Sequence, residues 1–152
     1  MEKVYFEDLR VGDVVVTPAR TITEADLVLF ASLTGDWHPL HTDIEYAKRS
    51  VFGERIAHGL LILAVGTGLM FRASKYAALP ETTLALAGME KVRFVSPTRL
   101  GDTIHLESEV VRATAVDRER GLITMSQRVK NQRAEEVLTF TLKLLLSRQP
   151  QG

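Results

Sequence analysis

Apolar residues between Thr23 and Gly35 recur at helical spacing, with Leu27, Phe30 and Ala31 on one side of the segment. Thr23 is a residue type that favours helix N-caps, and Asp26 follows it three positions later, as in a capping box. Gly35 stands where a glycine commonly ends a helix. The pattern therefore predicts a short amphipathic helix between Thr23 and Gly35.

A second segment is apolar on nearly every side, which indicates a different environment. It begins at Gly59 and continues to about Tyr76, and no charged residue occurs between Gly59 and Phe71. A bilayer span requires about 20 apolar residues, so this run is too short to cross a membrane. Hydrophobicity all round the helix predicts burial on most sides.

After residue 82 the period of the pattern changes from helical to alternating. Residues 83–95 are expected to form a strand, and the longest alternating face covers residues 138–146. Short polar turns between successive strands predict antiparallel pairing, in a sheet of roughly five strands. Residues 14–22 are extended, and Pro18 suits an edge strand or a bulge. The fold class is α+β, with one buried helix against an antiparallel sheet.

The predicted sheet and helix leave apolar surface that one chain does not cover. The long regular strand at 138–146 is expected at an edge, where unpaired backbone groups can pair with another strand. The helix is also more apolar than the face that one sheet can cover. We therefore expect a homodimer whose sheet continues across two subunits, or a higher assembly of such dimers.

Composition mainly excludes classes of function. The 152 residues suit one domain spanning 1–152, and 19 basic residues balance 19 acidic ones. This balance gives no general attraction to nucleic acid or to an anionic membrane. The chain has no cysteine, which excludes disulfides, thiolate catalysis and cysteine-ligated metal sites. Acidic residues near the start do not resemble a signal peptide, so a cytoplasmic location without membrane attachment is expected.

The segment Gly35-Asp36-Trp37-His38-Pro39-Leu40-His41-Thr42-Asp43 concentrates the candidate chemistry. In one interpretation Asp36 and Asp43 cap turns or helices, Asp43 capping a short helix that follows it, and the histidines are structural. In a second, His38 and His41 join an aspartate as metal ligands, although their spacing matches no strong zinc signature. In the third, Asp36 and His41 share one water molecule as general acid and base.

A glycine at the start of the apolar helix favours the third interpretation. Gly59 lies in the first helical turn, where the backbone N–H groups have no partner within the helix. Such an N–H, aided by the helix dipole, can stabilise negative charge on a carbonyl oxygen. The neighbouring His58 is interpreted as a buried histidine bonded to a backbone carbonyl.

These residues resemble the signature of the MaoC-like dehydratases, the (R)-specific enoyl-CoA hydratases of hot-dog fold. The family motif G-D-x-N-P-[LIV]-H corresponds to Gly35-Asp36-Trp37-His38-Pro39-Leu40-His41, and [IV]-x-H-G corresponds to Ile56-Ala57-His58-Gly59. Arg93-Phe94, Ser96-Pro97 and Gly101-Asp102-Thr103 resemble the strand and turn that follow. The resemblance implies a hot-dog fold, in which an antiparallel sheet wraps around a central helix, and a homodimer. It also implies reversible hydration of trans-2-enoyl-CoA to (R)-3-hydroxyacyl-CoA.

The resemblance assigns roles residue by residue. Asp36 and His41 match the catalytic pair, and the backbone N–H of Gly59 matches the donor to the thioester carbonyl. His38 replaces the usual asparagine, and Thr67 falls where some members have a pocket serine, so both are substrate-binding candidates. The resemblance implies no cofactor, because coenzyme A is part of the substrate, and no metal is expected.

Two other functions stay open from the sequence. A hot-dog thioesterase would bind the same acyl-CoA but would cleave the thioester. A non-catalytic acyl-CoA-binding protein or accessory subunit of a dehydratase is also compatible with the motif, and the His38 replacement favours such divergence.

Overall fold

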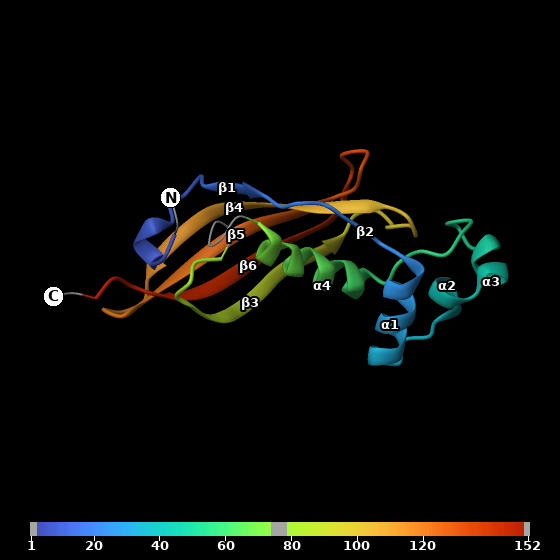
Figure 1. Ribbon diagram of the computed structural model, residues 1–152, viewed down its shortest axis with the longest axis horizontal. Helices are drawn as coiled ribbons and strands as arrows, with labels where there is room; N and C mark the ends of the chain where they lie inside the picture. The colour runs from blue at the N-terminus through green and yellow to red at the C-terminus, as the bar shows by residue number, and fades with distance from the viewer. Residues whose placement is uncertain (1–2, 74–78, 151–152) are drawn as a thin grey trace.

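A long antiparallel sheet and one helix packed against it form the body of the molecule (Figure 1). The computed structural model describes residues 3–73 and 79–150. The main sheet has the order β1-β4-β5-β6-β3, and the short strand β2 also pairs with β4. The strands are β1 (Val14–Val16), β2 (Arg20–Thr21), β3 (Thr83–Phe94), β4 (Thr103–Ala115), β5 (Arg120–Lys130) and β6 (Glu136–Ser147). The predicted α+β class is confirmed.

Alternation along β4, β5 and β6 separates a buried face of the sheet from a polar one. The polar face carries ion pairs between strands, such as Lys130 with Glu107 at 2.9 Å. The buried face supplies most of the core, including Ile104, Leu106, Val110, Ile123, Met125, Val129, Phe140, Leu142, Leu144 and Leu146.

The helix boundaries follow the capping residues that the sequence identifies. Helix α1 (Glu24–Thr34) begins after Thr23, whose N–H donates to the Asp26 carboxylate at 2.8 Å, and it ends at Gly35 with a positive φ of 79°. Helix α3 (Ile44–Lys48) begins after Asp43, whose carboxylate accepts the N–H of Tyr46 at 3.0 Å. These predictions are confirmed. The sequence did not predict the short helix α2 (Pro39–Thr42).

The apolar helix is shorter than predicted and only partly buried. Helix α4 (Gly59–Leu69) is followed by the 3₁₀ turn η2 (Met70–Arg72); a similar turn, η1 (Phe6–Asp8), lies near the N-terminus. The predicted end near Tyr76 falls outside the described residues. Leu60 is 61% exposed and Phe71 is 79% exposed, so the expectation of burial on most sides is wrong for this chain alone. One sheet covers only one face of a helix, and here that face holds Leu61, Ile62, Gly66 and Leu69.

The last strand is not at an edge, which corrects a second expectation. β6 pairs with β5 on one side and with β3 on the other, so β3 forms the edge of the sheet. Successive strands pair as predicted from β4 to β6, but β3 does not pair with β4. Residues 95–102 carry the chain from one edge toward the other side of the sheet, and an alternating pattern does not encode such a crossover.

The helices gather around the start of α4. Helices α1, α2 and α3 lie beyond one end of the sheet, and the two termini lie toward the opposite end (Figure 1). These helices place the polar segment 35–58 beside the first turn of α4.

No helix in the described part of the chain is both long and apolar enough to cross a membrane.

Candidate active site

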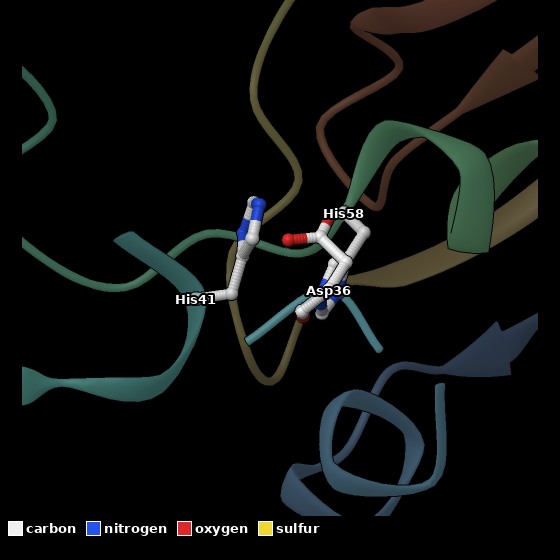
Figure 2. Close-up of side chains that lie close together, drawn as sticks. All are labelled: Asp36, His41 and His58. Carbon is white, nitrogen blue, oxygen red and sulfur yellow. The ribbon is translucent and has the colours of Figure 1, made fainter. Parts of the chain in front are cut away.

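Three side chains from three separate segments meet beside the start of α4 (Figure 2). Asp36 follows the C-cap of α1, His41 belongs to α2, and His58 immediately precedes α4. Each offers one nitrogen or oxygen atom, and these atoms lie within 4.8 Å of one another. The fold thus brings an acid and two imidazoles together beside the start of α4.

The backbone around Asp36 is held on both sides. Gly35 adopts a left-handed conformation, which turns the chain out of α1, and the Asp36 Oδ1 accepts the N–H of His38 at 3.2 Å. The carbonyl oxygen of Asp36 accepts the Nε2–H of His58 at 3.0 Å. The Asp36 carboxylate is exposed and turns toward the His41 ring (Figure 2).

The hydrogen bond of His41 fixes which of its nitrogens is available. Its Nδ1 lies 2.8 Å from the carbonyl oxygen of Ile56, and since a carbonyl only accepts, Nδ1 carries the proton. The neutral ring therefore keeps a lone pair on Nε2. Burial lowers the pKa of His41 below its ordinary 6.5, and the nearby His58 and His38 act in the same direction. The bond to Ile56 and the charge of Asp36 oppose this shift but do not reverse it. The lowered pKa of His41 favours the neutral ring, which can act as a base.

His41 and Gly59 face one cavity of about 400 Å³, which is also lined by Leu60, Phe94 and Pro97. As the first residue of α4, Gly59 has an N–H without an acceptor inside the helix. A Cβ at Gly59 would lie 2.7 Å from the Phe94 ring, closer than real Cβ contacts. An alanine at this position would have to displace the ring of Phe94, the last residue of β3.

The two substrate-binding candidates are placed differently. His38 caps α2, its Nδ1 accepting the N–H of Leu40 at 3.1 Å, and its ring lies 6.1 Å from that of His41. Thr67 lies two turns along α4, where its hydroxyl donates to the carbonyl oxygens of Leu63 and Ala64. Thr67 lines a separate cavity of about 650 Å³ between α4 and β3, so the structure does not bring it to Asp36 and His41.

His58 contacts the pair Asp36 and His41, here called the dyad, more closely than the sequence predicted. The prediction of a buried histidine bonded to a backbone carbonyl is confirmed, since His58 is 2% exposed and bonds to Asp36. The prediction missed that the His58 ring also stacks on the His41 ring, with centroids 3.9 Å apart. The signal that could have indicated this position is a histidine directly before the glycine that starts the apolar helix.

Asp36, His41 and His58 are also the group that could hold a metal ion within the described residues. An imidazole binds a metal through a lone pair in its ring plane, and the two rings lie only 27° from parallel. Their in-plane lone pairs therefore run side by side and do not converge on one point. We assign no metal to this group, and the absence of a metal from the chemistry stays a prediction.

The sequence matches the MaoC like domain family over residues 8–132. It is 34% identical over 124 residues to the (R)-specific enoyl-CoA hydratase of Rhodospirillum rubrum, covering 79% of this chain and 76% of that protein. It is 41% identical over 110 residues to the protein MaoC of Klebsiella aerogenes. That match covers 72% of this chain but only 31% of the length of the Klebsiella protein.

Solved structures agree with the sheet and helix described above. A monoamine oxidase regulatory protein from Archaeoglobus superposes with a TM-score of 0.90 and 37% sequence identity, over 99% of this chain and 98% of the other. A Mycobacterium tuberculosis protein described as a double hot-dog fold superposes with a TM-score of 0.81 over 99% of this chain and 46% of the other, at 23% identity. The fold is the hot-dog fold.

Proposed function

This chain belongs to the MaoC-like dehydratase family, and on that premise we propose that it reversibly hydrates trans-2-enoyl-CoA to (R)-3-hydroxyacyl-CoA. The observation that carries the proposal is the position of His41, which lies beside the Asp36 carboxylate and shares a cavity with Gly59 at the start of α4. The name of the Rhodospirillum relative supports the substrate class and the stereochemistry. The proposed reaction uses no cofactor.

In this mechanism the substrate carbonyl binds at the start of α4. The thioester oxygen accepts the Gly59 N–H, which draws electrons from the conjugated double bond and stabilises the enolate that forms. The cavity beside Gly59 is largely apolar, with Leu60, Phe94 and Pro97 in its lining. A low-polarity wall strengthens this hydrogen bond to the developing negative charge.

A water molecule between Asp36 and His41 supplies the added atoms. One side chain takes a proton from the water as its oxygen attacks C3, and a proton reaches C2 of the enolate from the same side. Polar atoms of Asp36 and His41 lie within 4.8 Å of each other, close enough for one water molecule to contact both side chains. The Nε2 lone pair of His41 is the acceptor that the Ile56 bond leaves available.

We also propose that two chains pair through β3, as the sequence led us to expect for a different strand. β3 has one strand partner, β6, among the described residues, so its other edge is available for pairing. Leu84, Leu86 and Phe94 on this strand are more than half exposed. The exposed Leu60 of α4 and Phe71 of η2 add apolar surface, which a partner chain would cover.

The test is hydration of crotonyl-CoA, which is measured as the loss of absorbance of the conjugated enoyl thioester. Chiral analysis then identifies the stereochemistry of the product. We expect Asp36→Asn and His41→Gln each to lower kcat about 10²–10⁴-fold, the usual contribution of general acid–base catalysis. Asp43→Asn is the matched control, because asparagine also caps helices and Asp43 serves α3. This control should keep the wild-type rate.

Three results would contradict the proposal. Near wild-type hydration by the Asp36→Asn, His41→Gln double variant would exclude the dyad. Release of free coenzyme A thiol would instead indicate a thioesterase. Binding of acyl-CoA with no change in absorbance would indicate a non-catalytic subunit.

A further inference from the structure

One buried imidazole contacts both members of the proposed dyad. The Nε2–H of His58 donates to the Asp36 carbonyl oxygen at 3.0 Å, and one face of its ring stacks on His41. The Phe30 ring packs against it with centroids 5.0 Å apart and an interplanar angle of 59°. The next residue in the chain is Gly59, so His58 joins all three elements of the proposed site.

We propose that His58 is the positioning residue of this site, holding the Asp36 main chain with its one N–H and supporting the His41 ring with its face. The inference rests on the proposed hydratase function for its kinetic part. It does not make His58 a catalytic residue, because the His58 side chain is 2% exposed, whereas Asp36 is exposed.

The chemistry of the ring favours this role over simple core filling. Because Nε2 donates to a carbonyl, neutral His58 carries its proton there and leaves a lone pair on Nδ1. Nδ1 is buried and finds no donor among the described residues. A buried polar atom without a partner is unfavourable, and a phenylalanine would avoid that penalty. Stability alone therefore does not favour histidine at this position.

The two contacts can be separated by substitution. His58→Gln keeps an amide N–H that can reach the Asp36 carbonyl but removes the stacked ring. His58→Phe keeps a ring against His41 but removes the donor. We expect kcat to fall about tenfold to a hundredfold in both variants with KM changed less than about threefold, because small misplacements of reacting groups cost up to about 10²-fold.

The pH dependence distinguishes the two variants. The titratable and charged groups near the His41 ring are Asp36, His38 and His58, and the Arg55–Glu24 ion pair lies next to the His41 main chain. Burial is the main cause of the lowered His41 pKa, and His58 contributes to that lowering. In His58→Gln water reaches His41, so its pKa should rise toward 6.5. In His58→Phe the His41 ring stays covered, so burial still lowers the His41 pKa and only the smaller contribution of His58 is lost.

The experiment combines crotonyl-CoA kinetics with NMR titration of the four histidine rings, with folding followed by circular dichroism. His105→Gln on β4 is the matched control and should change neither kcat nor the His41 titration. A wild-type kcat in either His58 variant overturns the proposal. So does a loss of rate no larger than the loss of folded protein, or a His41 titration that does not move in His58→Gln.

A measurement on the unmodified protein keeps the test decisive if both variants fail to fold. Nitrogen–proton correlation spectra should show the His58 proton on Nε2, and a proton on Nδ1 overturns the inference. The NMR results also separate the two proposals. If the wild-type chain hydrates no enoyl-CoA, the proposed function fails, while the tautomer and the His41 titration still test the contacts of His58.

Discussion

At the scale of single residues, the environment of His41 determines what its imidazole can do. Its Nδ1–H is committed to the carbonyl of Ile56, so only Nε2 is available to take a proton. The sequence identified His41 and Asp36 as a pair because of their spacing around Pro39. It could not show the Ile56 bond or the His58 stack, since both join segments that are distant along the chain.

The lowered pKa of His41 predicts where this side chain titrates. Burial disfavours the charged ring, so the midpoint in the folded protein should lie below 6.5. Since a base must be neutral, kcat/KM should hold its value through pH 6.5 and fall only when the pH drops below the lowered pKa. An NMR titration of His41 and a pH–rate profile check this. A His41 midpoint at or above 6.5 would contradict it.

At the scale of elements, the contact between the start of α4 and the end of β3 shapes the proposed carbonyl site. Gly59 was singled out from the sequence because it opens an apolar helix. The structure adds that a larger residue would collide with the Phe94 ring, which lies 2.7 Å from where a Cβ would be. Periodicity predicted both elements, but it carries no information about which end of a strand meets a helix.

Substituting two of the three glycines of α4 separates the proposed catalytic role of Gly59 from helix stability. Gly59→Ala should push away Phe94 or shift the helix start, moving the N–H and lowering kcat/KM by about 10²–10³-fold. Gly68→Ala is the control on the same helix, because its Cβ would meet open space. This variant should keep full activity, and its free energy of unfolding, measured with denaturant, should increase by up to about 1 kcal/mol. Equal activity in both variants would contradict the role of Gly59.

At the scale of the whole molecule, the two sheet edges differ in length and in the side chains that they expose. β1 is a short edge, while β3 is a twelve-residue edge with exposed leucines. Short edge strands limit unwanted pairing, and long apolar ones promote it. The sequence correctly indicated an incompletely covered chain but assigned the open edge to β6.

The proposed dimer predicts that new charges on β3 weaken the assembly and that a new charge on β1 does not. Leu84→Lys with Leu86→Lys places charges where we expect β3 to meet its partner, and burying unpaired charge is costly. The dissociation constant of the dimer should rise at least about a hundredfold, which corresponds to about 2.8 kcal/mol. Val14→Lys on β1, where Val14 is similarly exposed, should leave the assembly unchanged. Analytical ultracentrifugation checks both, and a wild-type monomer at micromolar concentration would refute the dimer.

The sequence by itself determined the main helices and strands, their caps and the segment that holds the candidate site residues. These features depend on local spacing, such as the Thr23 cap, the Gly35 helix end and the alternation along 138–146. The tertiary structure alone decided that β6 lies inside the sheet, that Thr67 faces another cavity and that the His58 ring stacks on His41. Each depends on contacts between distant segments, which are set by the packing of the whole chain.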